Sequence, residues 1–366
     1  MDFINTLKKV TKITNFSSSI DYITLRFIPA LTLVCGLVFT YKQNAKSSIS
    51  CYSSIPSSGI GLGDFIENSC YYAERFYNLV STGSLEPLPF QNIYPFLPII
   101  LLVQTATLCL PKIFWVFFGN RTELSYLLKL CLNYDINGGH KSNEKLLVYF
   151  YKYLMKNGNS KWNCHFLIGY FTTKLFSLFI CGTNLLFLYN EIFSKNLFYP
   201  VAILKQLIIS NSSINNPSIS IFQQVVMCKV QLFHTGSENN FAVQCILLYN
   251  CYYEKVFAFI TFLIVLSMVL TMMDVIKWVI FYVFKPFVLL YYLDFNSVLH
   301  KNNNIIKSKD DLFTTFVKSM SLDLYFSILM IGCNANHIIA TEVLNELYGN
   351  FKLIYQRENR QFETLV

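Results

Sequence analysis

Residues 228–245 read CKVQLFHTGSENNFAVQC, and they place two cysteines seventeen positions apart in a polar interval of a mostly apolar chain. A long apolar run follows, from Tyr253 to Met273 and on to Phe284. An apolar run of about 20 residues is long enough to cross the hydrocarbon core of a bilayer as a helix. The side of the membrane on which the polar interval lies therefore decides whether its cysteines form disulfides.

The composition of the chain indicates a membrane protein. Of its 366 residues 54% are hydrophobic and 14% are charged, whereas soluble domains carry about 25% charged residues. We predict an all-α fold with four transmembrane helices, at residues 20–41, 94–118, 166–189 and 253–284. A cleaved signal peptide is the competing interpretation of the first run, but some twenty polar or mixed residues precede it and no good cleavage site follows.

The lysines and arginines between these runs predict the orientation, because cytoplasmic loops carry an excess of both. The connection 119–165 holds seven: Arg121, Lys129, Lys141, Lys145, Lys152, Lys156 and Lys161. The longer connections, 42–93 and 190–252, hold three each. We therefore expect residues 1–19, 119–165 and 285–366 in the cytoplasm, with both termini inside, and the other two connections outside.

Cysteine usage agrees with this orientation. Five of the eleven cysteines lie in or beside the two expected extracellular loops: Cys51, Cys70, Cys228, Cys245 and Cys251. Disulfides persist in the oxidising exterior. Spacing alone leaves the connectivity open, since four cysteines allow three pairings.

Several stretches in this arrangement resemble one family. The first extracellular loop contains KQNAKSSISC (42–51) and FIENSCYYAERFY (65–77), and the second apolar run is IYPFLPIILLVQTATLCLPKIFW (93–115). The second loop contains FQQVVMCKV (222–230) and VQCILLYNCYYEKVF (243–257). These residues resemble the innexins, the gap-junction channel proteins of invertebrates, and more distantly the pannexins. The family's pentapeptide Tyr-Tyr-Gln-Trp-Val is altered here to Ile-Tyr-Pro-Phe-Leu at 93–97.

The resemblance extends along nearly the whole chain. The stretch DLYFSILMIGCNANHIIATEVLNELY (323–348) follows the innexin pattern of cytoplasmic helices. The resemblance implies two disulfides per subunit, Cys51 to Cys245 and Cys70 to Cys228, which leaves Cys251 unpaired. It also implies that the cytoplasmic helices form a collar below a pore.

A pore needs several subunits around an axis, and the resemblance implies a ring of about eight. The N-terminal segment MDFINTLKKVTKI reads as a short amphipathic helix. The resemblance places it in the pore mouth, so the expected pore-lining residues are Met1, Asp2, Asn5, Lys42 and Lys46. The alternative is a helix that lies on the membrane surface, with its lysines at anionic headgroups.

Ionisable residues within apolar runs are candidates for function. Among those near the expected cytoplasmic ends are Arg26, Lys174, Asp274 and Lys277. We interpret them chiefly as side chains that reach towards the headgroups. Pro98 and Pro111 lie in the second run and are candidate hinges.

Two peripheral motifs suggest modification and binding. Asn211 begins an Asn-Ser-Ser glycosylation acceptor in the second extracellular loop. The chain ends in Glu-Thr-Leu-Val, so Thr364 and Val366 fit a ligand of PDZ domains. No catalytic motif, metal-ligand spacing or Lys/Arg run occurs, so we expect neither an enzyme nor a bound cofactor, metal or nucleic acid.

Three functions fit this pattern. The first is a channel subunit that docks with a ring on the neighbouring cell and passes ions and small metabolites through a gap junction. The second is an undocked, pannexin-like hemichannel of the plasma membrane, which the altered pentapeptide and Asn211 favour. The third is a four-helix adhesion or scaffold protein, against which the long basic connection 119–165 argues.

Overall fold

The computed structural model describes residues 19–45, 49–52, 62–72, 76–79, 85–88, 91–119, 165–193, 195–196, 198–208, 222–234, 237–285, 312, 315–334 and 337–363. The chain divides into two compact units. One comprises Leu25–Cys109 and Phe179–Val269, and the other comprises Met1–Thr24, Leu110–Leu178 and Leu270–Val366. We call the first the sheet unit and the second the tail unit.

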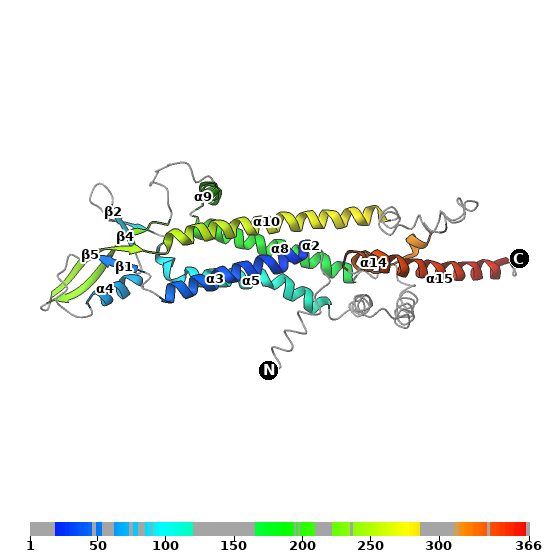
Figure 1. Ribbon diagram of the computed structural model, residues 1–366, viewed down its shortest axis with the longest axis horizontal. Coiled ribbons are helices and arrows are strands. Elements are labelled where there is room, and N and C mark those ends of the chain that lie inside the picture. Colours follow the sequence, from blue (N-terminus) through cyan, green and yellow to red (C-terminus); the bar gives the residue numbers. More distant parts are fainter. Residues whose placement is uncertain are drawn as a thin grey trace, which may run out of the picture. The chain divides into compact units, whose positions relative to one another are not determined.

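Four described helices are long and apolar enough to cross a membrane: Ile20–Gln43, Ile93–Phe117, Phe166–Ile192 and Asn250–Val283. The prediction of a helical, four-span chain is thus confirmed. The first span combines α2 (Ser19–Tyr22), a π-helical turn (Ile23–Phe27) and α3 (Ile28–Ala45). The second span is α5 (Leu97–Gly119), and a 3₁₀-helix (Gln91–Phe96) precedes it. The third is α8 (His165–Phe187), and a π-helical turn (Leu188–Ile192) follows it. The fourth is α10 (Asn250–Val283). Figure 1 labels these helices.

The two candidate hinge prolines occupy different places in the second span. Pro98 is the second residue of α5, which begins at Leu97 directly after the 3₁₀-helix that ends at Phe96. In a first helical turn the missing N–H of proline costs no intrahelical hydrogen bond. Pro111 lies in the interior of α5, where a proline removes one such bond. A hinge role of either proline stays a prediction.

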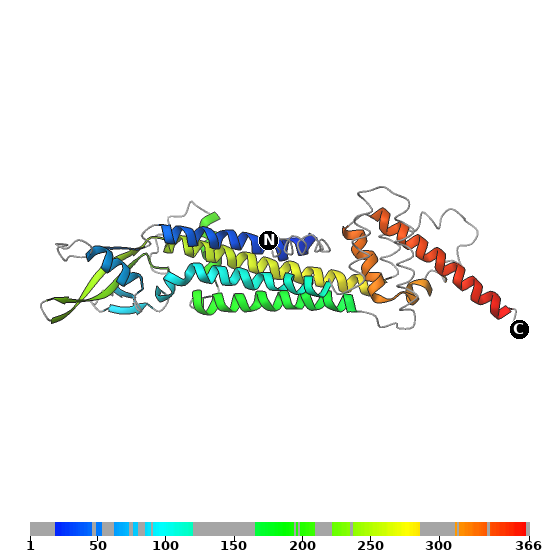
Figure 2. The same cartoon turned by 90° about the horizontal axis from the view of Figure 1, so that it is seen from below.

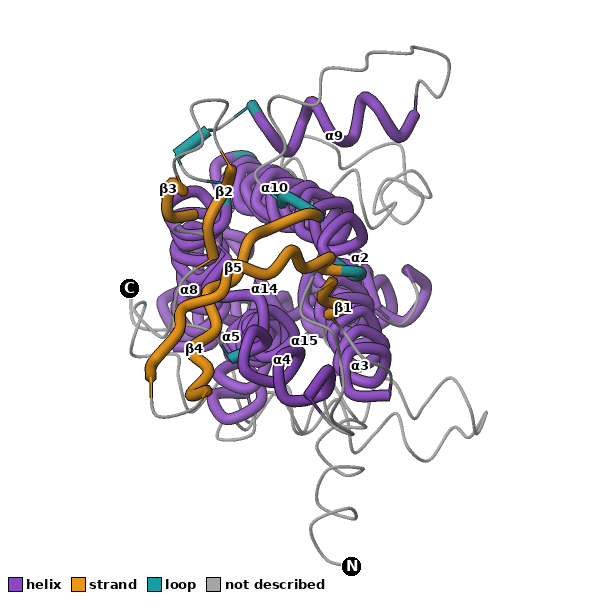
Figure 3. The backbone as a smooth tube through the Cα atoms, turned by 90° about the vertical axis from the view of Figure 1, so that its left-hand side faces the viewer, coloured by secondary structure: helices purple, strands orange, loops and turns teal. Residues whose placement is uncertain are grey.

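The sheet unit also contains a five-stranded sheet, which the sequence analysis did not predict. Its strands are β1 (Ile49–Tyr52), β2 (Phe76–Leu79), β3 (Leu85–Leu88), β4 (Val225–His234) and β5 (Ser237–Leu247). They lie in the order β1-β5-β4-β2-β3, and every neighbouring pair is antiparallel. Figure 3 shows the sheet, in which strands from both long connections lie side by side.

Residues on β4 alternate between buried and exposed positions. Val226, Cys228 and Val230 are buried, whereas Val225, Lys229 and Gln231 are exposed. This period of two is the pattern of a strand with one covered face. Helix α4 (Leu62–Tyr71) contacts β1 and β4, while α9 (Tyr199–Ile208) lies on the other side of the unit.

The tail unit has an apolar core around α14 (Leu322–Asn334). From Asp323 to Gly332 every residue of α14 is buried, and a helix that is apolar all round is expected only in a core. Aromatic rings from three other helices pack with it: Trp115, Phe166, Tyr170 and Trp278 belong to the same cluster. Helix α15 (His337–Glu363) packs against α14 (Figure 2). The connection 119–165, which the sequence places in the cytoplasm and for which helices are expected, lies outside the described residues between Gly119 and His165.

Candidate functional site

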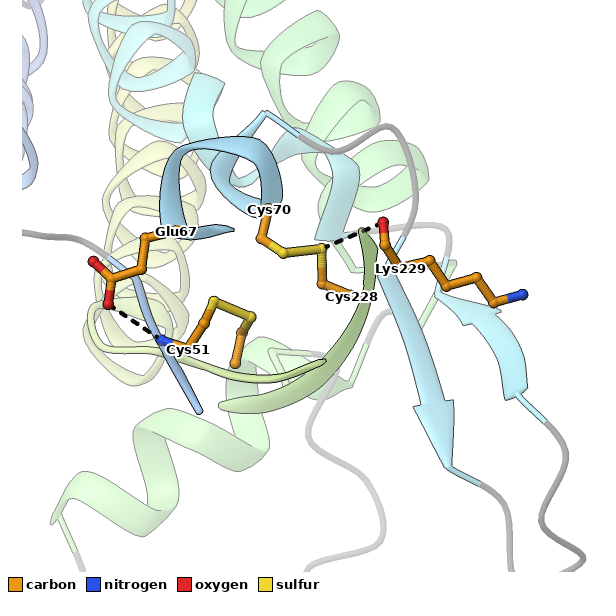
Figure 4. The surroundings of a disulfide bond; sticks show 6 residues. Cys51, Glu67, Cys70, Cys228 and Lys229 are labelled. Carbon is orange, nitrogen blue, oxygen red and sulfur yellow. Dashed lines mark hydrogen bonds between the residues drawn. A yellow bond between two sulfur atoms is a disulfide. The ribbon is translucent and has the colours of Figure 1, made fainter. Parts of the chain in front are cut away.

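Two disulfides join the long connections within the sheet unit. Cys51 on β1 pairs with Cys245 on β5, with their Cα atoms 4.0 Å apart, and Cys70 on α4 pairs with Cys228 on β4 at 5.9 Å. These are the pairs that the innexin resemblance implies. Cys51 and Cys245 lie directly opposite each other in the antiparallel register, where Cα atoms approach closely enough for a cross-strand bridge. Figure 4 shows both bonds beside α4.

The two disulfides lie next to each other. The sulfur atoms of Cys51, Cys70 and Cys245 are within 4.8 Å of one another. A metal would need thiolates, but these sulfurs are bonded in pairs, so this cluster is a covalent joint. The backbone N–H of Cys51 also donates to Oε1 of Glu67 on α4, at 3.4 Å (Figure 4). The joint therefore fixes β1, α4 and the β4–β5 hairpin to one another.

A glutamine in the last turns of α3 connects this joint to the spans. Nε2 of Gln43 donates to the hydroxyl of Tyr71 on α4 at 2.7 Å and to the backbone oxygen of Tyr94 at 3.4 Å. Its Oε1 accepts a hydrogen bond from the hydroxyl of Tyr253 on α10. Gln43 is 5% exposed, and both its amide nitrogen and its amide oxygen have hydrogen-bond partners. This buried amide therefore connects α3 to α4, to the 3₁₀-helix that contains Tyr94, and to α10. The position of Gln43 in the sequence does not reveal this role, because its partners lie 28 to 210 residues away.

The altered pentapeptide at 93–97 lies in the same region. Tyr94 and Leu97 are buried, and the Tyr94 ring packs edge-on against Tyr71 and Tyr253 at centroid distances of 6.2 and 6.3 Å. Phe96 is exposed. The stretch thus supplies internal packing between α4 and the spans, besides one exposed aromatic side chain.

A buried ion cluster lies in the tail unit. The ammonium group of Lys174 on α8 contacts Oδ1 of Asp21 on α2 and lies 2.6 Å from Oδ2 of Asp274 on α10. The hydroxyl of Tyr170 is 2.9 Å from a carboxylate oxygen of each aspartate. All three charged side chains are at most 4% exposed. The interpretation of Lys174 and Asp274 as side chains that reach the headgroups is therefore wrong, because each has its opposite charge inside the protein.

Asp323 attaches α14 to the first turn of α8. Its Oδ2 accepts from the backbone N–H of Phe166 at 3.2 Å, and its Oδ1 accepts from that of Leu167 at 3.0 Å. The first N–H groups of a helix have no partner within the helix, and the helix dipole favours an anion there. Asp323 is thus a capping residue supplied from another helix, which its sequence position could not reveal.

The end of α10 meets α14 through polar contacts. Nζ of Lys285 donates to the backbone oxygen of Met320 at 3.1 Å and lies 5.3 Å from the centre of the Tyr325 ring. The Tyr325 hydroxyl donates to the backbone oxygen of Phe281 at 2.6 Å. Burial lowers the pKa of Lys285 to about 8 and raises the pKa of Tyr325, since burial disfavours the charged form of each group.

The predicted pore residues are mostly beyond the described part of the chain. Lys42 is exposed in the last turn of α3. Met1, Asp2, Asn5 and Lys46 lie outside the described residues, as do Asn211, Thr364 and Val366. Cys251, which the pairing scheme leaves without a partner, is a half-buried free thiol in the first turn of α10.

The described polar groups hold the helices and strands to one another. The polar groups described above are committed to one another: the glutamine to its tyrosines, the lysine to its aspartates, and Asp323 to the start of α8. Buried groups paired in this way fix the positions of helices. These features define a four-span membrane protein whose two long connections are joined by disulfides.

The chain belongs to the innexin family: the family model described as Innexin matches residues 17–351. Innexins form gap-junction channels and are known as channel proteins rather than enzymes. The chain is 22% identical to Innexin-19 of Caenorhabditis elegans over 411 aligned residues, which cover 99% of this chain and 87% of that protein. It is 19% identical to Innexin-11 of that nematode, covering 95% and 81%, and 19% identical to Innexin-16, covering 72% of each. Low identity over nearly full length makes it a divergent member.

Proposed function

We propose that this chain assembles into a ring of about eight identical or related subunits, and that two rings on adjacent cells dock into a channel. The channel passes ions and small metabolites down their gradients. The observation that carries this proposal is the family match over residues 17–351, together with both disulfides between the two long connections.

The orientation belongs to the same proposal. Residues 119–165 carry seven lysines and arginines, so they are assigned to the cytoplasm of a plasma-membrane protein. The disulfides are then extracellular, where they persist. The N-terminal segment is assigned to the pore mouth, with Met1, Asp2 and Asn5 beside the pore, and Lys42 and Lys46 near its outer end.

Docking requires a rigid extracellular surface on each subunit. Antiparallel pairing of strands from both loops, two disulfides and the Gln43 hydrogen bonds supply that rigidity. Preorganised surfaces bind more tightly because less conformational entropy is lost when they associate. This sheet is therefore the element assigned to contact the opposed ring.

The second candidate is an undocked channel that releases ions and metabolites from single cells. Its support is the altered pentapeptide at 93–97 and the acceptor at Asn211, where a bulky sugar would obstruct a facing ring. Membrane lipid around the spans and a PDZ domain bound to Thr364 and Val366 are further proposed partners.

Coupling between two cells separates the two candidates. The chain is expressed in paired cells that have no channels of their own, and junctional current and dye transfer are measured beside dye uptake into single cells. We expect junctional current between pairs. Uptake into single cells without transfer would favour the undocked channel. Absence of both, with the protein at the cell surface, would contradict both candidates and favour an adhesion or scaffold protein.

A further inference from the structure

A pocket lies between α5 and α8 within the sheet unit. Its volume is about 270 Å³, and four polar side chains line it: Gln104, Thr107, Thr183 and Asn184. Apolar side chains, among them Val103 and Phe187, complete the walls. Ligand pockets characteristically combine apolar walls with a few polar groups that fix orientation.

The side-chain amide of Gln104 has no partner among the described residues. Gln104 is 3% exposed, and neither its Oε1 nor its Nε2 has a hydrogen bond. Its neighbours are satisfied, since Nδ2 of Asn184 donates to Oγ1 of Thr107 at 3.1 Å and to the backbone oxygen of Ile180 at 2.9 Å. A buried amide without partners is costly, and it is most costly in a membrane, where polar residues mark functional sites.

Gln104 lies near the middle of its span, eleven residues from Ile93 and thirteen from Phe117. At 1.5 Å per residue this places it about 16 Å from the end at Ile93. The side chains at the rim of the pocket, Ile99, Val103 and Phe187, are exposed and apolar. A molecule that enters here therefore comes from the hydrocarbon and carries no net charge, since a charge at this depth is expensive.

A second copy of the chain that packed through α3 or α10 would not satisfy Gln104. At this depth the large exposed side chains on the described parts of α3 and α10 are hydrocarbon; they include Leu33, Val34, Leu37, Phe262, Val265 and Leu266. Such faces pack well but donate and accept no hydrogen bonds. Packed through either of these faces, a second copy would leave the Gln104 amide without a donor and an acceptor.

We propose that this pocket binds a small neutral amphiphile headed by a primary carboxamide. A primary carboxamide presents one acceptor and N–H donors in a plane, as the glutamine amide does. The two groups can therefore form two hydrogen bonds to each other, while the aliphatic tail lies along Val103 and Phe187. Both amide atoms of Gln104 are covered by neighbouring side chains, so the head group meets them when the Gln104 side chain turns towards the pocket. This inference goes beyond the channel function and is tested by binding alone.

The test uses photolabelling of the full chain in lipid nanodiscs. The probe is a medium-chain primary carboxamide that carries a diazirine in its tail, and labelled peptides are mapped by mass spectrometry. We expect saturable adducts within residues 99–107 and 183–187. The unlabelled primary carboxamide should compete, whereas its N,N-dimethyl analogue, which accepts but cannot donate hydrogen bonds, should not.

Variants identify the group that binds. Gln104→Leu removes both hydrogen bonds and should reduce saturable labelling roughly three- to tenfold. Val103→Trp should block the mouth from an exposed position, whereas Leu110→Trp, two turns further along the same helix and also exposed, should leave labelling unchanged. If Gln104→Leu does not fold, the labelling of Val103→Trp and the competition by the two unlabelled amides test the proposal without it.

Three results would overturn the proposal. The first is labelling that does not saturate or that spreads evenly to exposed positions such as Leu175 and Phe179. The second is equal competition by the dimethyl analogue. The third is undiminished labelling in folded Gln104→Leu or in Val103→Trp.

Discussion

The ammonium nitrogen of Lys174 lies 2.6 Å from Oδ2 of Asp274, and both side chains are buried in the tail unit. Asp21 completes the cluster, so one lysine serves two carboxylates that come from two other spans. Charges taken out of water need opposite charges with good geometry. The cluster therefore specifies which faces of α2, α8 and α10 meet.

Removing the lysine should be strongly destabilising. Lys174→Met leaves two buried carboxylates without a cation, which should cost about 3–5 kcal/mol. The apparent midpoint of thermal unfolding of the purified protein in detergent measures the effect. Lys277→Met is the matched control, since Lys277 is only half-buried and its ammonium lies over the Phe281 ring at 5.4 Å. Equal midpoints for the two variants would contradict the assignment of a buried ion cluster.

Each disulfide should contribute a similar amount to the free energy of unfolding when the other disulfide is present. The two bridges join residues 194 and 158 positions apart, and the Cys70–Cys228 bridge is nested within the Cys51–Cys245 bridge. Once either bridge has formed, the other therefore closes a loop of only 36 residues, which is the difference between the two separations. On the chain-entropy model each single removal then costs about 4 kcal/mol, and loss of the second bridge costs about 5 kcal/mol more. Cys-to-Ser pairs at 51/245, at 70/228 and at all four positions test this by thermal unfolding. A single pair that abolishes folding would show that one bridge has a separate role.

The cap between α14 and α8 should protect the first turn of α8. Asp323→Ala leaves the N–H groups of Phe166 and Leu167 without their acceptor, which should cost about 1–2 kcal/mol. Hydrogen exchange at residues 166–170 should accelerate. Asp323→Asn keeps an acceptor but loses the charge, so exchange should lie between that of the wild type and Asp323→Ala. Unchanged exchange in both variants would argue against the cap.

Stability should rise in mildly alkaline solution because of Lys285. Its pKa is lowered to about 8 from 10.5, so between these values the unfolded chain binds more protons than the folded one. Stability therefore increases as the pH rises through this window. Tyr325 acts in the opposite direction, because its pKa is raised from 10.0 and stability is lost above that value.

Unfolding midpoints between pH 7.5 and about pH 9.5 isolate the lysine, since Tyr325 stays neutral there. Lys285→Met should remove the rise. A rise of equal size in Lys285→Met would assign it to another group.

The sequence predicted the four spans because each consists of about 20 or more apolar residues, a signal that needs no tertiary information. Part of the sheet also has a recognisable pattern in the sequence. Cys228 and Val230 alternate with the polar Lys229 and Gln231, and β5 follows after only Thr235 and Gly236, which is the pattern of a hairpin. This alternation covers only part of one strand, so it is a weaker signal than the apolar runs of the spans.

Other features could not be predicted from one chain without its fold. Lys174 and Asp274 lie in apolar runs about 100 residues apart in the sequence, so a side chain that reaches the headgroups is the simpler interpretation until the helices are placed together. Asp323 likewise caps a helix that begins about 160 residues earlier. Pairings over such separations depend on tertiary packing, which local patterns do not encode.

Electron cryomicroscopy of the purified chain, viewed down the symmetry axis, would show whether the chain forms a ring. The account predicts a closed ring of about eight subunits around a central opening, with pairs of rings that meet through their disulfide-bonded sheets. Single rings alone would support the undocked channel. Monomers or small clusters without a central opening, from protein with both disulfides intact, would contradict the account.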